Sequence, residues 1–571
     1  MFRQQLDPVA SSLTVSALVA LLPLITIFLL LGVLRIKAHW AGLAAVAVAI
    51  IVAVLAFNMP VKLSLLSASE GAVFGLFPIM WIVFNALWVY QLTVVSGWFE
   101  QLRRSFSLVS DDPRVMAVLI AFCFGALLEA LAGFGAPVAI TGIMLVAVGF
   151  SPFRAAAVVL LANTAPVAFG AIATPIITAG VLTHIPYTDI GAVVGRQTPI
   201  LALFVPLVLV AMVDGRRGVR QTWPAALVCG LTFAVAQFVC ANYVSVELTD
   251  IIASLVAAGI TVAFLQVWHP EGTEEANRDL RAAAIAEYDE GGGTGVPVPA
   301  GSPTGTGRGT AVAAQEAPAR EMTGGRVFMA LLPYLIIIVV FSIAKLWGPA
   351  KTFLANSDVK VHWPGLDGHV LSRAGKPITS TIYNFQWLSS PGTLLLICGI
   401  IVALVYRIAP AVAAREYGLT AYRLRWAFLT VASVLALAYV MNQSGQTLTI
   451  GSWIARTGGI FAFLSPILGW LGTAVTGSDT SANALFSTLQ QSAAEKANLD
   501  ATLLVAANTS GGVVGKMISP QNLTIAATAV GILGREGDLF RFLVRSSIGL
   551  ILCLCVLVFL QSTSVLGWML P

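Results

Sequence analysis

Apolar windows about 20 residues long recur along the whole chain, from Leu13–Ile36 to Ile551–Leu570. A bilayer core about 30 Å thick requires about this many apolar residues for one spanning helix. Of the 571 residues, 58% are hydrophobic and only 10% are charged, whereas soluble domains carry about 25% charged residues. The first window is longer than a signal-peptide core and is expected to be a retained span. The sequence therefore predicts an all-α polytopic membrane protein.

Charge, histidine and cysteine exclude several other classes of protein. The net charge of +5 is explained by basic cytoplasmic loops, so no nucleic-acid partner is expected. The histidines lie at window ends or in loops without an HExxH motif, and the cysteines form no CxxC pair. We therefore expect no metal site, no cofactor and no catalytic dyad, and the chain is not expected to be an enzyme.

Lysine and arginine near the window ends predict the orientation in the membrane. Basic clusters alternate along the chain with loops that lack Lys and Arg, such as Asn242–Asp250. The clusters comprise Arg35, Lys37, Arg103, Arg104, Arg114, Arg216, Arg217, Arg220, Arg407, Arg415, Arg423 and Arg425. If every cluster is cytoplasmic, both termini lie outside.

Residues 269–325 differ in composition from the rest of the chain. They open with Glu and Arg and continue into GGGTGVPVPAGSPTGTGRGT, whose Gly, Pro and Thr residues cannot form a core. We expect a flexible cytoplasmic linker between an N-terminal membrane half, residues 1–268, and a C-terminal half, residues 326–571. The long loop Gly348–Ser390 is expected to cap the outer face.

The two halves contain a repeat. The tripeptide ANT occurs at Ala162–Thr164 and at Ala507–Thr509, an offset of 345 (507 − 162). The same offset relates Gly170 to Gly515, and a Thr-Pro pair to a Ser-Pro pair. Each copy follows an apolar stretch that is interrupted by a glycine-rich tip. The expected elements are a first hairpin over 116–150, a broken helix over 154–182, a second hairpin over 460–490 and a broken helix over 500–531.

Loop charges predict that these repeats are inverted. Arg114 and Arg154 flank the first hairpin, which should therefore enter from the cytoplasm. The second hairpin follows four cytoplasmic arginines by one span, Trp426–Met441, and should enter from outside. Inverted repeats with interrupted helices place substrate and ion sites near the bilayer midplane in many secondary transporters. A channel would need a repeated pore ring, and an intramembrane enzyme would need a catalytic constellation, so the pattern favours a carrier.

Three charged residues lie near the expected hairpin tips and helix breaks. Glu129 and Asp479 are candidate proton-coupling residues, because burial in a low dielectric disfavours their charged forms. Glu129 could equally be a structural acid, and Asp479 a helix cap. Lys516 is a candidate partner for a substrate carboxylate, or a permanent counter-ion of Glu129 or Asp479.

Neutral polar residues complete the predicted substrate site. The helices are expected to unwind at Asn163 and Thr164, and at Asn508 and Thr509; the alternative role is hydrogen bonding between packed helices. The hydroxyl groups of Ser478, Thr480 and Ser481 are expected to face a polar cavity. Glycines should permit the backbone turns rather than bind substrate. They are Gly133, Gly135, Gly170, Gly477, Gly511, Gly512 and Gly515.

Several long motifs resemble one known family. They are FCFGALLEALAGFGAPVAI, NTAPVAFGA, VGRQTP, GWLGTAVTGSDTSANALF, LLVAANTSGG and GKMISPQN. These stretches, and nearly the whole chain, resemble the L-lactate permeases. The resemblance implies an elevator-like ion-transporter fold with two re-entrant hairpins and about 12 spanning helices. The glycine-rich linker is longer than expected for the family, but it contains none of the motifs.

The resemblance also implies a function. Such permeases import L-lactate and related short 2-hydroxymonocarboxylates, including D-lactate and glycolate, by proton symport across the bacterial inner membrane. The termini would then be periplasmic, the energy source the proton gradient, and the partners a monocarboxylate, protons and membrane lipid. Sodium is the rival coupling ion, because Ser478, Thr480, Asn163 and backbone carbonyls could supply its oxygen ligands. The oligomeric state is left open, with a homodimer as one option.

Overall fold

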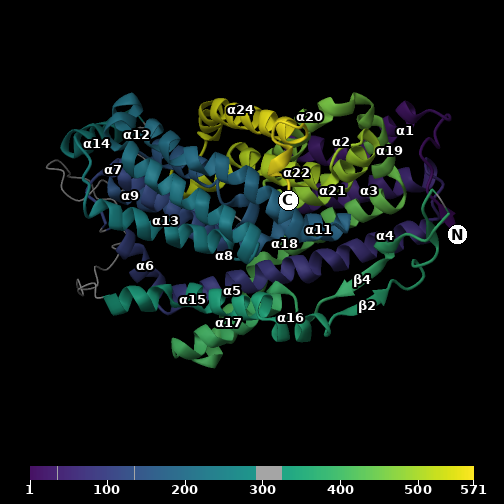
Figure 1. The fold of residues 1–571 in the computed structure, drawn as a ribbon, viewed down its shortest axis with the longest axis horizontal. Helices are drawn as coiled ribbons and strands as arrows, with labels where there is room; N and C mark the ends of the chain where they lie inside the picture. The colour runs from purple at the N-terminus through teal and green to yellow at the C-terminus, as the bar shows by residue number, and fades with distance from the viewer. Residues whose placement is uncertain (35, 108, 134, 291–323, 374) are drawn as a thin grey trace.

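The computed structural model describes residues 1–571 except 35, 108, 134, 291–323 and 374. Helices make up most of it (Figure 1). Within the described residues, nine helices are long and apolar enough to cross a membrane, or ten if one bent pair counts as a single span. The count differs from the expected number of about 12 partly because α12 (Tyr187–Val239) joins two apolar arms across a kink at Asp214 and Gly215.

Fourteen helices precede the undescribed segment 291–323, and the last of them lies within the expected linker. They are α1 (Leu13–Ala20), α2 (Leu22–Phe28), α3 (Ala38–Leu55), α4 (Val61–Phe74), α5 (Trp81–Val95), α6 (Trp98–Ser107), α7 (Pro113–Ala117), α8 (Gly125–Ala132), α9 (Ala136–Val148), α10 (Pro152–Ala162), α11 (Gly170–Thr183), α12, α13 (Thr249–Leu265) and α14 (Thr273–Glu290). A π-helical segment, Val118–Phe124, makes α7 and α8 one continuous arm.

Helices of the second half follow the undescribed segment 291–323. They are α15 (Gly324–Leu346), α16 (Gly348–Ala355), α17 (Pro391–Val405), α18 (Pro410–Gln443), α19 (Gln446–Ile454), α20 (Phe461–Thr476), α21 (Asp479–Ala497), α22 (Ala501–Gly515), α23 (Pro520–Val530) and α24 (Glu536–Gln561). Two of them, α17 and α23, begin with a serine cap followed by proline. At α23, for example, Ser519 accepts a hydrogen bond from the Asn522 backbone and Pro520 opens the helix.

Short strands modify the expected all-α fold in the loop between α16 and α17. Strand β2 (Val359–His362) pairs antiparallel with β4 (Ile382–Phe385), with Val359 opposite Phe385. Strand β1 (Phe2–Arg3) pairs in parallel with β3 (Val370–Leu371), so the N-terminal residues lie against this loop. Figure 1 shows these strands at one end of the long axis and α14 at the other.

At each of the two positions where a hairpin is expected, a glycine turn joins two consecutive helices. The first joins α8 to α9 through Gly133 and Gly135, whose φ angles are +34° and +84°. The second joins α20 to α21 through Gly477, with φ +76°. Positive φ is the region that glycine occupies without steric cost, so these residues make the sharp reversals. Adding 345 to the bounds of α9 gives 481–493 (136 + 345 to 148 + 345), which lies within α21.

Each hairpin is followed by an interrupted helix. Helices α10 and α11 are bent by 64° at their break, where Asn163 ends α10. In the second half, α22 continues unbroken through Asn508 and Thr509 and ends only at Gly515. The expected unwinding at Asn508 and Thr509 is therefore wrong. The break lies instead at Lys516–Ser519, because Pro520 cannot continue a helix from the preceding turn.

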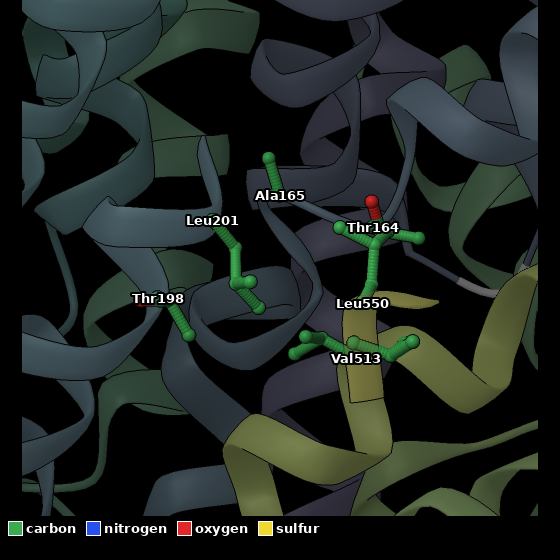
Figure 2. A pocket seen from close by; sticks show the side chains of 7 residues that line it. Thr164, Ala165, Thr198, Leu201, Val513 and Leu550 are labelled. Carbon is green, nitrogen blue, oxygen red and sulfur yellow. The ribbon is translucent and has the colours of Figure 1, made fainter. Parts of the chain in front are cut away.

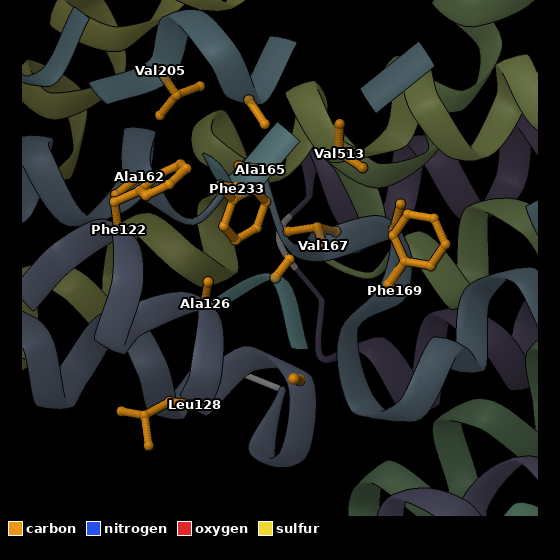
Figure 3. Close-up of a cluster of buried hydrophobic side chains, with 14 of the residues drawn as sticks. Phe122, Ala126, Leu128, Ala162, Ala165, Val167, Phe169, Val205, Phe233 and Val513 are labelled. Atoms are coloured by element: carbon orange, nitrogen blue, oxygen red, sulfur yellow. The ribbon is translucent and has the colours of Figure 1, made fainter. Parts of the chain in front are cut away.

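Two large hydrophobic clusters form the interior of the described chain. One includes residues of the first hairpin, both interrupted helices and α24. The other joins α2, α3 and α4 to α18 and α21. Figure 3 shows part of the first cluster, where Phe122 and Phe233 lie near the break between α10 and α11. Their ring centroids are 4.8 Å apart. Apolar side chains therefore pack against one side of the helix break.

The start of the expected linker differs from a flexible chain. Helix α14 is held by ion pairs from Arg217 to Asp279 (2.7 Å) and from Arg535 to Glu287 (2.7 Å). Thr273 at its first residue donates a hydrogen bond to Asp112 (2.9 Å). Its acidic side chains thus find partners on the basic ends of neighbouring helices. Residues 291–323, which hold the glycine-rich part of the linker, lie outside the described residues.

Candidate functional site

The side chain of Glu129 is buried one turn before the tip of the first hairpin. It lies on α8 and is 3% exposed. The helix ends four residues later, where the Gly133 backbone N–H donates to the Glu129 carbonyl (3.4 Å). A Cβ atom on Gly170 would lie only 3.0 Å from Glu129 Oε1. The absence of a side chain at Gly170, at the start of α11, therefore allows the carboxyl group to approach the helix break.

Lys516 forms an ion pair with Glu129. Lys516 Nζ lies 2.5 Å from Glu129 Oε1, and the lysine side chain is also buried. Asn163 Nδ2 donates to the second oxygen, Oε2, at 2.9 Å. Together with Asn163, the ion pair joins the first hairpin to both interrupted helices, and thus connects the two repeats. Of the two roles expected for Lys516, this conformation has the counter-ion role, and the pairing compensates two charges that would be costly to bury separately.

Asp479 lies in the first turn of α21, at the tip of the second hairpin. The preceding residue, Ser478, caps the helix by accepting from the Ser481 backbone (3.3 Å). Thr473 Oγ1 donates weakly to Asp479 Oδ1 (3.4 Å). The other oxygen, Oδ2, is buried and has no hydrogen-bond partner in the described part of the chain. Lys516 is close enough to attract this carboxylate as well, so its ammonium group lies in the field of both acids.

The amide and hydroxyl groups of α22 serve helix packing in this conformation. Asn508 Nδ2 and Thr509 Oγ1 donate to Asn483 Oδ1, at 2.9 and 3.0 Å. Gln490 Nε2 donates in turn to Asn508 Oδ1 (3.3 Å). Asn508 and Thr509 therefore adopt the alternative role, hydrogen bonding between packed helices. Asn483 was not predicted as a site residue, although its position four residues after Asp479 places both on one face of α21.

The glycines fall into two groups. Gly133, Gly135 and Gly477 make the hairpin turns as expected, and Gly170 lies at a helix break. Gly511 and Gly512, by contrast, lie inside α22 in ordinary helical conformation, so their predicted role in a backbone turn is wrong. A Cβ on Gly512 would overlap Asp479 Oδ1, and one on Gly511 would overlap the Pro466 carbonyl. Glycine at these two positions instead allows α22 to lie close to the Asp479 carboxyl group and to the Pro466 carbonyl.

Helix α22 packs on α20 through backbone contacts at three glycines. Cβ atoms on Gly469, Gly511 and Gly515 would overlap the carbonyl oxygens of Asn508, Pro466 and Trp470, respectively. We call this set the α20–α22 glycine contact. Gly515, which was expected at a helix break, is the last residue of α22.

The backbone at the first break is strained. Ala171, Ile172 and Ala173 have φ angles of +44°, +57° and +57°, which forms a left-handed turn. This conformation costs about 1–2 kcal/mol for each residue with a Cβ atom. All three side chains are buried, so the surrounding packing holds the turn. It follows directly after Gly170, beside the Glu129 carboxyl group.

A small cavity lies beside the first break. It is lined by Thr164, Ala165, Thr198, Leu201, Val513, Val514 and Leu550, and holds about 10 Å³ (Figure 2). That volume suits at most one water molecule. Thr164 Oγ1 donates to the Leu161 carbonyl (2.7 Å), and Thr480 and Ser481 are buried at the other tip. The cavity beside Thr164 is thus too small for a carboxylic acid.

Comparison with known proteins assigns the chain to a family. The family model for L-lactate permease matches residues 16–565. An L-lactate permease of Bacillus subtilis is 40% identical over 592 aligned residues, which cover 100% of this chain and 99% of the relative. The glycolate permease GlcA of Escherichia coli is 43% identical, with 94% of each chain covered. An L-lactate permease of E. coli is 38% identical, with 100% of each chain covered.

The chain belongs to the L-lactate permease family. It is therefore a multi-pass membrane transport protein, and not an enzyme. In this chain, the two residues expected to carry protons and the buried Lys516 lie at the meeting point of the hairpin tips and interrupted helices. No cluster of three or more metal-ligating side chains is found among the residues that the structure describes.

Sequence reasoning missed further buried polar residues of the permease. Gln197 on α12 accepts from Ser510 on α22 (2.7 Å) and donates to Gln561 on α24 (2.9 Å). Gln237 on α12 donates to Asp250 at the start of α13 (2.9 Å). Gln197 lies within VGRQTP, one of the motifs that carry the family resemblance, so this motif could have indicated it. Asp250 was predicted only to lie in an outer loop.

Proposed function

We propose that the chain imports L-lactate, D-lactate and glycolate with protons across the bacterial inner membrane. The supporting observation is the buried ion pair between Lys516 and Glu129, held by Asn163. A lysine is a suitable partner for a substrate carboxylate, but here it is already paired. The names of the relatives, L-lactate permease and glycolate permease, support the choice of substrates.

The ion pair suggests how a proton couples to substrate. Protonation of Glu129 removes its negative charge and releases the Lys516 ammonium group. The substrate carboxylate then replaces Glu129 as the counter-ion of Lys516, and the net charge of the buried site stays the same. Without the proton, substrate entry would add an uncompensated charge, which a buried site disfavours strongly. Substrate and proton therefore bind together.

The membrane potential requires the same coupling. A monocarboxylate that enters a negative-inside cell moves against about 2.3 kcal/mol per 100 mV. One accompanying proton makes the translocated species neutral. Sodium is the alternative coupling ion, and we would place it at the buried Asp479 carboxyl, one oxygen of which has no hydrogen-bond partner within the described residues.

We also propose the predicted transmembrane arrangement. With α12 counted as two spans on either side of its kink, the two interrupted helices as one span each, and the hairpins as re-entrant, the chain has about 12 spans. Both termini, β2 and β4 are then periplasmic, and α14 is cytoplasmic. An elevator-like cycle, in which the hairpin tips separate from the site, would let substrate reach the buried Lys516.

The test uses purified protein in proteoliposomes. Under an inward pH gradient without sodium, we expect wild-type protein to accumulate L-lactate, with D-lactate and glycolate as competitors. Glu129→Gln should bind lactate with an affinity that no longer depends on pH, and should not accumulate it. Glu495→Gln, which changes an exposed acid on α21, is the control and should behave as wild type. Uptake that needs sodium and ignores the pH gradient contradicts proton coupling, and full accumulation by Glu129→Gln removes Glu129 from it.

A further inference from the structure

Asp250 is a buried acid that the proposed coupling mechanism does not use. It lies in the first turn of α13 and is 1% exposed. Its Oδ1 accepts a hydrogen bond from Gln237 Nε2 (2.9 Å). Its Oδ2 is buried and has no hydrogen-bond partner among the residues that the structure describes. An ionised carboxylate with one orphaned oxygen is costly in such a place.

Gln237 connects Asp250 to the first helix break. The same Nε2 lies 3.4 Å from the Ala165 carbonyl, and Gln237 Oε1 accepts from Thr198 Oγ1 (3.4 Å). Ala165 and Thr198 both line the small cavity beside the break. The Asp250 carboxyl group is therefore separated by one side chain from a space with room for at most one water molecule.

The titratable groups around Asp250 are carboxyl groups and thiols rather than cations. From α8, Glu129 repels the Asp250 carboxylate electrostatically. From the turn after α12, Cys240 faces it. Glu247, on the chain just before α13, accepts from the Tyr187 hydroxyl (2.8 Å) and from Ser245 (2.8 Å). Cys123 and Cys229, on the packed elements η3 (Val118–Phe124) and α12, contact each other instead. The orphaned oxygen thus faces no positive partner in the described chain.

We propose that Asp250 is a second proton-binding carboxyl group of the transport cycle, located between the outer end of α13 and the Glu129–Lys516 pair. This inference rests on the proposed proton symport. Both protonation states have support in the fold, which a carrier of protons requires. The N-terminus of α13 favours the ionised form, whereas protonation turns the orphaned Oδ2 into a hydroxyl donor.

Repulsion between the two acids makes their protonation interdependent. A proton on Asp250 removes a negative charge near Glu129 and favours the ionised, lysine-paired form of Glu129. A proton that moves to Glu129 releases Lys516 for substrate and leaves Asp250 ready for the next proton. The Gln237 side chain and the cavity beside Ala165 mark the direction of this transfer.

The test compares net transport with exchange in proteoliposomes. Asp250→Asn keeps the acceptor for Gln237 but resembles a permanently protonated acid. We expect its pH-gradient-driven lactate uptake to fall by about a hundredfold, the lower end of what a positioned proton-transfer group contributes. Exchange of internal for external lactate, which needs no net proton movement, should fall far less. Asp250→Glu should recover part of the driven uptake.

A matched control and a second variant make the outcomes decisive. Asp189→Asn changes an exposed acid in the first turn of neighbouring α12 and should transport as wild type. If Asp250→Asn accumulates lactate as Asp189→Asn does, or loses exchange and uptake equally, the inference is wrong and proton symport stands. If wild-type protein shows no gradient-driven uptake, the proposed function itself fails. Should Asp250→Asn not fold, Gln237→Met, which cuts the link to Ala165, must show the same separation of uptake from exchange, and equal losses would overturn the proposal.

Discussion

At the scale of single residues, the ion pair between Glu129 and Lys516 dominates the energetics of the site. Both side chains are buried, and they lie 387 residues apart in the sequence. Removing one partner of a buried pair leaves an uncompensated charge, whereas removing both charges does not. A single variant, which removes one charge, and a double variant, which removes both, therefore separate the contribution of the pair to stability from its contribution to transport.

Lys516→Gln should lower the stability of the protein by about 3–5 kcal/mol, because the Glu129 carboxylate then lacks its cation. The double variant Glu129→Gln with Lys516→Gln should recover most of that loss but should not accumulate lactate. Melting temperatures in detergent and uptake in proteoliposomes measure the two effects. A double variant as unstable as the two single changes added together would show that the residues do not act as a pair.

Gly512 should not tolerate even a methyl group, since its Cβ would overlap Asp479 Oδ1. We expect Gly512→Ala to lower stability by about 1–3 kcal/mol, the usual cost of overpacking, and to impair uptake by displacing Asp479. Gly549→Ala on α24 is the matched control, because open space surrounds that position. It should be neutral or more stable, since alanine favours a helix by about 0.5–1 kcal/mol. Equal melting temperatures for the two variants would contradict the close approach.

The sequence indicated the chemistry of the site better than its contacts. Glu129, Asp479 and Lys516 were identifiable because charges are rare within apolar windows. The contacts were harder to predict, because the bond from Asn163 to Glu129 and the bonds from Asn508 and Thr509 to Asn483 join residues that are distant in sequence, and no local pattern records such a pairing. Asp250 was read as part of a loop, since nothing in its neighbours shows that α12 buries it.

At the scale of elements, the left-handed turn Ala171–Ala173 is the most unusual feature of the interrupted helices. The hairpin tips could be predicted because glycine marks them directly. The turn could not, because Ala and Ile ordinarily avoid this conformation, and only tertiary packing enforces it. The second break was placed too early for a related reason: the repeated ANT suggested symmetry, while Pro520 determined where α22 ends.

Glycine at position 173 should relieve part of this strain. We expect Ala173→Gly to keep or raise the melting temperature, because the left-handed conformation costs alanine about 1–2 kcal/mol. Ala157→Gly in α10, an equally buried position with ordinary helical backbone, should lower stability by about 0.5–1 kcal/mol. Thermal unfolding of the two variants measures the difference. Equal destabilisation would mean that the turn carries no strain.

At the scale of the whole molecule, the short strands and helix α14 lie at opposite ends of the described chain. The strands β2 and β4, with the N-terminal β1, lie at one end of the long axis, and α14 lies at the other (Figure 1). The predicted outer loop and cytoplasmic linker, which stay predictions, would require such a separation. The charge pattern made that prediction accessible, because loop arginines report sidedness even where helix contacts are unknown.

Single cysteines in a background without the six native ones should report this sidedness. Asp111→Cys and Glu275→Cys, both exposed near α14, should react with an impermeant maleimide only from the cytoplasmic side. Gly459→Cys and Glu495→Cys, exposed on either flank of the second hairpin, should react only from outside. Labelling of all four positions from one side would contradict inverted repeats.

The α20–α22 glycine contact has an evolutionary consequence. Because carbonyl oxygens occupy the space of a side chain at Gly469, Gly511 and Gly515, selection for packing alone should retain glycine at these positions in relatives of any substrate preference. Invariance there would record a mechanical constraint, since two helices this close move as one part. Divergence between lactate and glycolate carriers should instead concentrate at side chains that reach the surroundings of Lys516.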